Sequence, residues 1–314
     1  MSKGLGWIKG EQGQIEDILV VLGGLVAVGL LALFVLSDAR LNKTYDLPEE
    51  MIAIDVPTDE ASIERGRHLV TEAGLCMACH GENLGGGIDE RAASLGRIVA
   101  SNLTSGKGGI GNEFSDADFV RAIRHGVGPD GKPLVLMPSN YLFTLGDSDL
   151  AAIIAYLKSL PPVDNELPST SVSLTARLFL LIGPRGEGLP AEGIDHTGPR
   201  SPAPPPGVTA DYGKYLANGI GMCVACHGPD LTGVQPEPGE PPAPNLTPGS
   251  ELAGWSEGDF ITALRTGVTP DGHKLDGEFM PWPYYKMTDD ELKAIWLYLQ
   301  SLPAKEGVEH EHAE

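Results

Sequence analysis

Basic side chains are scarce in this chain of 314 residues. It has 22 lysine and arginine residues against 43 aspartate and glutamate residues, so its net charge is -21. Nucleic-acid binding needs a basic face that neutralises phosphates, and this charge balance therefore argues against that class of function. The acidity favours a solvated surface, and it would also suit docking to a basic partner protein.

Cysteine is also scarce. The chain has four, and all of them lie in two short stretches, GLCMACHG from Gly74 and GMCVACHG from Gly221. No cysteine is left for a separate disulfide framework, so the cysteine count alone does not indicate a cellular compartment. The arrangement of these four residues is the more informative feature.

Each stretch has the spacing C-x-x-C-H, the signature for covalent attachment of a c-type haem. Two thiols one helical turn apart can reach the two vinyl groups on one haem edge, and the adjacent histidine can then ligate the iron. A thioredoxin-like dithiol would need a nearby βαβ pattern, and a zinc site would need the two pairs tens of residues apart. The sequence therefore predicts two covalently bound haem c groups. The predicted attachment residues are Cys76 and Cys79 with His80 as iron ligand, and Cys223 and Cys226 with His227 as iron ligand.

Alternating apolar and polar residues, which would predict strands, are missing. The chain instead repeats itself. The segment from Arg65 aligns without gaps to the segment from Tyr212, and later segments match in the same order. Apolar residues recur at helical spacing in the last segment of each half. We therefore expect an all-α fold with two tandem copies of one domain, at residues 58–162 and 208–303.

Long apolar runs are missing except for one, Ile18–Leu36. Nineteen helical residues span about 28 Å, close to the thickness of a bilayer's hydrocarbon core. A cleaved signal peptide would have a shorter apolar region followed by small residues at a cleavage site. The sequence favours a retained transmembrane helix at 18–36. The remaining predicted segments are an N-terminal anchor region 1–36, a tether 37–57, a proline-rich linker 163–207 and a disordered acidic tail 304–314.

One part of the linker, Val172–Gly183, is apolar but too short to span a bilayer. We weigh two interpretations. The first is a segment packed across the two domains, and the second is a docking or membrane-surface element.

The second axial ligand of each iron is predicted by elimination. Of the seven methionines, only Met137 and Met280 occupy matching positions in the two halves, and each precedes a proline. His125 and His273 remain alternatives, although neither has a histidine at the equivalent position of the other half. Ligation by histidine and methionine leaves no open position for oxygen or peroxide and raises the reduction potential, which favours electron transfer.

Polar residues that recur in both halves are candidate partners of the haem propionates. An ordinary role on a helix surface is the alternative for the arginines. The candidates are Asn102, Arg124, Asn245 and Arg265.

These motifs together resemble class I cytochrome c domains. In each half, C-x-x-C-H-G-x-x-L-x-G is followed by N-L-T, F/W-S-x-x-D-F, M-P and a D/E-L-x-A-I segment that ends in S-L-P. The pattern is most similar to the dihaem and multihaem cytochrome c subunits that accept electrons from membrane-bound alcohol, aldehyde and gluconate dehydrogenases. Many of those carry three haems and a cleaved signal, whereas this chain has two motifs and an apparent anchor.

The resemblance implies a membrane-anchored dihaem cytochrome c that passes single electrons and has no small-molecule substrate of its own. The expected partners are the lipid bilayer and redox proteins, namely a dehydrogenase, a quinol-oxidising complex or a terminal oxidase. A dihaem subunit of a terminal oxidase is an alternative, and a dihaem peroxidase is an alternative from another class. Because haem is attached to such proteins outside the cytoplasm, we expect both domains on the periplasmic side of a bacterial cytoplasmic membrane, with residues 1–17 inside.

Overall fold

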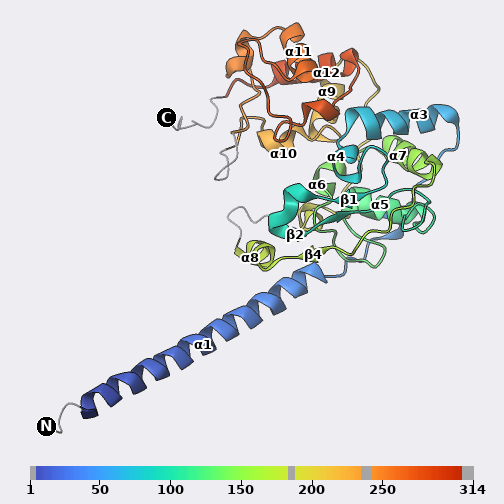
Figure 1. Ribbon diagram of the computed structural model, residues 1–314. Coiled ribbons are helices and arrows are strands. Elements are labelled where there is room, and N and C mark those ends of the chain that lie inside the picture. Colours follow the sequence, from blue (N-terminus) through green and yellow to red (C-terminus); the bar gives the residue numbers. More distant parts are fainter. Residues whose placement is uncertain (1–4, 183–187, 235–241, 306–314) are drawn as a thin grey trace.

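The computed structural model describes residues 5–182, 188–234 and 242–305, and it shows one long helix leading into two mainly helical domains (Figure 1). Most of the predicted acidic tail, residues 306–314, lies outside the described residues.

The long helix α1 (Leu5–Leu41) extends beyond the predicted span 18–36 at both ends, so the first residues of the predicted tether are helical. Its segment Glu16–Leu41 is long and apolar enough to cross a membrane. Leu19, Leu25 and Leu31 are 62%, 64% and 64% exposed. An apolar surface of this extent is unusual on a protein surrounded by water.

Short helices and two small sheets follow α1, and the prediction of a mostly helical chain is confirmed. The sequence did not predict the four strands, which have two residues each; β1 pairs with β3 and β2 pairs with β4, both antiparallel. The elements of the first half are α2 (Glu49–Ile52), α3 (Glu60–His68), the π-helical turn η1 (Leu69–Ala73), α4 (Cys76–His80), β1 (Gly87–Ile88), η2 (Glu90–Leu95), β2 (Gly96–Arg97), β3 (Val99–Ala100), α5 (Asp116–His125), α6 (Ser139–Leu142) and α7 (Asp147–Ser159). The later elements are β4 (Ser171–Val172), α8 (Leu174–Ile182), η3 (Pro190–Gly193), α9 (Ala210–Asn218), α10 (Cys223–His227), η4 (Glu251–Gly254), α11 (Glu257–Thr266), η5 (Trp282–Tyr284) and α12 (Asp289–Ser301).

Each domain is built on one helix crossing, α3 with α7 and α9 with α12. A glycine lies at each crossing. A Cβ on Gly66 would lie 1.9 Å from the carbonyl oxygen of Ala152, and a Cβ on Gly213 would lie 1.9 Å from that of Ala294. Only glycine allows the backbones to approach this closely. The matching glycines show that both copies use the same packing.

The two domains meet through contacts that repeat around a pseudo-twofold relation. His68 and Tyr215 occupy equivalent positions in the two copies, as do Glu291 and Asp149. The His68 ring nitrogen Nε2 lies 2.7 Å from Glu291 Oε1 in the other domain, and the Tyr215 hydroxyl donates to Asp149 Oδ2 at 2.8 Å. The duplicated chain therefore packs like a homodimer whose two halves have since diverged.

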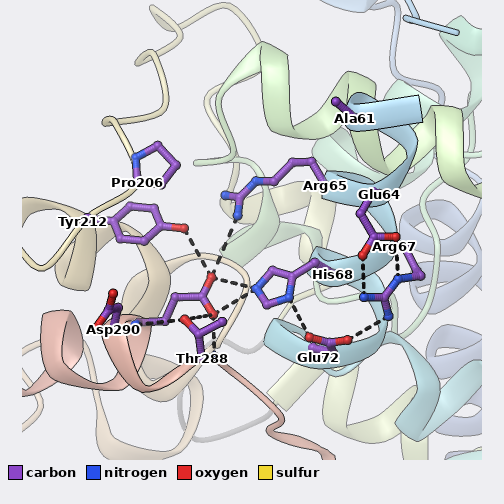
Figure 2. A pocket seen from close by; sticks show the side chains of 12 residues that line it. Ala61, Glu64, Arg65, Arg67, His68, Glu72, Pro206, Tyr212, Thr288 and Asp290 are labelled. Carbon is purple, nitrogen blue, oxygen red and sulfur yellow. Dashed lines mark hydrogen bonds and ion pairs between the residues drawn. The ribbon is translucent and has the colours of Figure 1, made fainter. Parts of the chain in front are cut away.

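A polar cleft of about 610 Å³ opens beside this contact. Figure 2 shows the His68 ring facing Glu72 on one side, with Arg65 extending from the same helix and Tyr212 across the cleft. His68 Nδ1 lies 2.7 Å from Glu72 Oε2, and Arg65 pairs with Asp149 at 2.9 Å. The described residues that line this cleft include none of the predicted haem ligands, so the cleft belongs to the domain interface.

The charge of His68 makes this interface dependent on pH. The hydrogen bond to Glu291 raises the pKa of His68 above its ordinary value of about 6.5. Its stabilising contribution is therefore complete below about pH 6.5 and is lost as the pH rises through the raised pKa. We expect His68→Gln to lower the free energy of unfolding by about 1.5–3 kcal/mol at about pH 6 and by less at about pH 9.

The equivalent residue Tyr215 supplies the control. Burial raises the pKa of Tyr215, so its hydroxyl stays protonated over this range. Urea unfolding of Tyr215→Phe should show the same loss at both pH values. A loss for His68→Gln that does not change with pH would contradict the charged contact.

The apolar linker segment does not pack across the two domains, so that interpretation is wrong. Residues Leu174–Ile182 form α8, which contacts α1 and η2. Arg177 holds it to α1 by an ion pair with Asp38 at 2.6 Å. The segment packs on α1 and not across the two domains because α1 provides both a carboxylate for Arg177 and an apolar surface for the short helix.

Candidate haem-binding sites

The two C-x-x-C-H motifs each form one short helix, α4 and α10, that begins at the first cysteine and ends at the histidine. The next residues, Gly81 and Gly228, have φ angles of 77° and 81°, which turn the chain sharply after the histidine. One helical turn places the two cysteines of each motif on the same side. All four thiols are free of disulfides.

Burial raises the pKa of the Cys76 and Cys223 thiols to about 12. These thiols stay protonated at neutral pH, which disfavours thiol–disulfide exchange because the thiolate is the attacking species. The sites thus fit a structural attachment role better than a redox-active dithiol.

Both motif histidines are held in the same way by a carbonyl from a later loop. His80 Nδ1 lies 2.8 Å from the Ser101 carbonyl oxygen, and His227 Nδ1 lies 2.7 Å from the Pro244 carbonyl oxygen. A carbonyl can only accept, so Nδ1 carries the proton and Nε2 keeps its lone pair. Burial lowers the pKa of both rings, which keeps them neutral. This is the tautomer and orientation of a metal-ligating histidine.

The loop after each histidine repeats an unfavourable backbone conformation. Leu84 and Leu231 have φ angles of 56° and 57° and are 1% and 0% exposed. Non-glycine residues rarely adopt positive φ, and such strain often lies at functional sites. Their carbonyls accept hydrogen bonds from the amides of Leu103 and Leu246, just after the loops that hold the histidines. This strain could not be predicted from the sequence, although both leucines belong to the shared motif.

Met137 and Met280 lie in irregular segments, and both pack partly buried against the hydrophobic core. Their carbonyls each accept a hydrogen bond at 2.7 Å, from the amides of Ser139 and Trp282. Met287, which has no methionine at the equivalent position of the first half, is 2% exposed and packs in the core. The two equivalent methionines thus share one local geometry, and the assignment of both as ligands stays a prediction.

The histidine alternatives fit less well. His125 is 2% exposed, and its two ring nitrogens lie 3.0 Å from His196 Nδ1 and 3.3 Å from the Met51 carbonyl oxygen. Both nitrogens therefore already have partners within the protein. His273 is exposed on a turn.

Arg124 and Arg265 hold the start of the last helix of each domain, α7 and α12. Arg124 donates to the Leu145 carbonyl oxygen at 2.8 Å and pairs with Asp147 at 2.7 Å, while Arg265 bonds the Met287 carbonyl oxygen and pairs with Asp289 at 3.0 Å. This role was not predicted from the sequence. The feature that could have indicated it is a matched pair of aspartates, Asp147 and Asp289, which lie two residues before Asp149 and Glu291.

Asn102 and Asn245 close a different loop. Asn102 accepts from the amide of Thr104 at 3.0 Å and donates to the Val163 carbonyl oxygen at 2.7 Å. Asn245 repeats the pattern with Thr247 and the Lys305 carbonyl oxygen, both at 2.8 Å. These contacts account for the burial of both asparagines without a propionate.

Arg124 has a further property that its counterpart does not share. Its side chain is 2% exposed, and among the described residues its Nε and Nη1 atoms are buried without a hydrogen-bond partner. Leaving two charged donors unsatisfied is costly. An acceptor from outside the polypeptide, such as a propionate, would satisfy them.

Comparison with known families identifies both halves. Residues 210–303 match the family described as Cytochrome c, and residues 61–157 match Cytochrome C oxidase, cbb3-type, subunit III. Each half of the chain therefore contains a cytochrome c domain. The recognition made from the motifs is confirmed.

Individual relatives extend this assignment. The chain is 32% identical to the fructose dehydrogenase cytochrome subunit of Gluconobacter japonicus and 31% identical to the alcohol dehydrogenase (quinone) cytochrome c subunit of Gluconobacter oxydans (strain 621H). Each match covers 78% of this chain, but 53% and 56% of the relative. The chain thus spans about half the length of these relatives. It is 29% identical to a diheme cytochrome c-type protein of Cereibacter sphaeroides over 79% of this chain and 88% of the relative.

The names of these relatives agree with an electron-transfer cytochrome rather than an enzyme with its own substrate. Two cytochrome c domains imply covalently bound haem c, and the diheme relative suggests two such groups.

Proposed function

We propose that this chain is a membrane-anchored dihaem cytochrome c that passes single electrons between redox proteins on the outer face of a bacterial cytoplasmic membrane. The observation that carries the proposal is the duplicated histidine geometry. In both domains Nδ1–H of the motif histidine donates a hydrogen bond to a carbonyl, which leaves the Nε2 lone pair for a metal. Two unrelated sites would not share both this contact and the strained leucine that follows it.

The residues fit one haem c in each domain. The thiols of Cys76 and Cys79, and those of Cys223 and Cys226, would form the covalent links. His80 with Met137 and His227 with Met280 would be the axial ligands. The unsatisfied donors of Arg124 fit a propionate of the first haem better than the asparagines do, because the asparagines already have partners. When bound, each haem supplies an iron that alternates between Fe(II) and Fe(III).

The protein groups then have two roles: they hold the iron ligands in position, and they exclude small molecules from the iron. The loop carbonyls fix the histidine rings, and the arginines hold the start of the last helix in each domain. With a histidine and a methionine from the chain as ligands of each iron, the protein would keep small molecules away from it. This arrangement supports electron transfer and disfavours the peroxidase alternative.

The anchor is α1. Its exposed apolar surface is long enough to cross a bilayer. Because haem c is attached outside the cytoplasm, the two domains would lie on the periplasmic side. We further propose the domain limits 58–162 and 208–303, which match the two helix crossings and their haem motifs.

The partner is proposed from the relatives, which are named as cytochrome subunits of dehydrogenases. The match of residues 61–157 to an oxidase subunit supports a terminal oxidase as the second candidate. Tagged full-length protein extracted from its native membrane in mild detergent should co-migrate with a dehydrogenase, identified by mass spectrometry. Co-migration with oxidase subunits instead would favour the second candidate. Recovery in the soluble fraction without detergent would contradict the anchor.

A further inference from the structure

The short helix α8 has one face that is apolar and open. Leu174, Leu178, Phe179 and Ile182 are 47%, 45%, 54% and 68% exposed. Leu178 and Phe179 lie four residues after Leu174 and Thr175, and Ile182 lies four residues after Leu178, so these five residues form one side of the helix, called here the outer face of α8. Monomeric soluble proteins rarely expose large apolar side chains in such a cluster, and a cluster of this kind marks a contact surface.

The opposite face fixes α8 to the end of the apolar part of α1. Ala176 is 6% exposed there. The Arg177 guanidinium donates to Ser37 Oγ at 2.9 Å and to Asp38 Oδ1 at 2.6 Å, and it lies 5.0 Å from the ring centroid of Phe34. The position of α8 along α1 is therefore specified by three neighbouring residues.

This position is the level at which the apolar surface of α1 stops. Asp38 is the first charged residue after the run Ile18–Leu36. Val35 and Leu36, just before it, are 58% and 57% exposed. In Figure 1, α8 lies on the side of the domains from which α1 extends. The outer face of α8 thus continues the apolar surface of α1 at its junction with the domains.

We propose that α8 lies on the bilayer surface with its outer face in the lipid, so that the chain meets the membrane at two places. This inference rests on the proposed anchoring by α1. The partner is a lipid bilayer and not an acidic or basic protein surface, because Arg177 is the only charge in α8 and Asp38 already pairs with it. A single transmembrane helix would let the domains swivel, whereas a second contact fixes which side faces the membrane.

The contacts of α8 indicate which haem site that side carries. The amide of Ser173, next to α8, donates to the Leu95 carbonyl oxygen of η2 at 2.8 Å. In the same short helix, Arg91 donates to the Ala78 carbonyl oxygen of α4 at 3.2 Å. A chain of direct contacts therefore runs from α8 to the first C-x-x-C-H motif. The first domain, and not the second, is held at the membrane.

Three single-cysteine variants of the full-length protein test this, each carrying a nitroxide label in phosphatidylcholine vesicles. The four natural cysteines are consumed by haem in the proposed function. Phe179→Cys reports on the outer face of α8, Leu25→Cys on the middle of α1, and Leu297→Cys on an apolar residue of domain two that is 39% exposed. Oxygen concentrates in hydrocarbon and a water-soluble nickel chelate does not, so their relative effects on the electron spin resonance signal distinguish lipid from water.

We expect the Phe179 label to resemble the Leu25 label, with an oxygen-to-nickel ratio several-fold above that of the Leu297 label. A Phe179 label open to nickel, with the Leu25 label in hydrocarbon, would overturn the inference and leave the anchor intact. A Phe179 label shielded from both reagents would mean that protein covers α8, which also overturns it. A Leu25 label open to nickel would overturn the anchor itself.

Discussion

Replacing Met280 with leucine is expected to lower the reduction potential of the second haem alone and to let carbon monoxide bind there. A methionine ligand raises the potential of haem iron, and axial ligands set that potential over a range of about 0.8 V. The expected fall is therefore on the order of 100 mV or more. Leucine keeps nearly the same volume, so packing should cost less than about 1.5 kcal/mol. A redox titration followed by haem absorbance measures both effects.

The matched control is Met287→Leu. Met287 lies in the core of the same domain and is 2% exposed. The same chemical change there should leave both potentials and the carbon monoxide response unaltered. If Met280→Leu also leaves the spectrum and the potential unchanged, Met280 is not a ligand and the assignment by matched positions fails. Met137→Leu should act in the same way on the first haem only.

Replacing Cys76 and Cys79 together with serine should halve the covalent haem content, from two groups per chain to one. The two attachment helices lie in separate domains, each with its own helix crossing, so the second site should still be filled. Haem is part of the interior of the first domain, and its loss should lower the melting temperature of that domain by more than a typical surface substitution does. Intact mass and pyridine haemochrome absorbance measure the number of haems.

The corresponding change of Cys223 and Cys226 is the control, since it should remove the other group and leave the first. Full loss of haem from either double variant would show that the sites do not load independently. Retention of two covalent haems would show that the altered thiols carry none.

The haem motifs could be assigned from sequence because their chemistry is local. Cys76, Cys79 and His80 lie within one helical turn, and the structure forms that turn as α4. The duplication provided a further criterion. A role shared by the two domains requires a residue at the equivalent position of each half, as with Met137 and Met280. Helix capping is equally local: Thr288 and Glu291, three residues apart, form a capping box at the start of α12.

Contacts between distant segments could not be assigned in this way. The burial of Asn102 depends on the Val163 carbonyl oxygen, 61 residues later, and sequence offered a propionate in its place. The packing of α8 against α1 joins Arg177 to Asp38 across 139 residues. The sequence shows that these residues are polar or charged, but only the folded structure shows which distant residue each of them contacts.

The contacts between the two domains could not be predicted from the sequence either. His68 and Tyr215 align with each other, and so do Asp149 and Glu291, yet alignment gave no reason for them to touch. The pseudo-twofold packing pairs His68 with Glu291 and Tyr215 with Asp149, so that each pair is the counterpart of the other. Such contacts place the two haem domains in fixed relation, which an electron relay between them requires.

The central claim is that one chain carries two iron centres, each closed by a histidine and a methionine. A spectroscopic redox titration of the purified full-length protein tests it most directly. We predict two one-electron steps per chain, with both haems six-coordinate in the oxidised and reduced forms. A single one-electron step, or a five-coordinate haem in either form, would contradict the account.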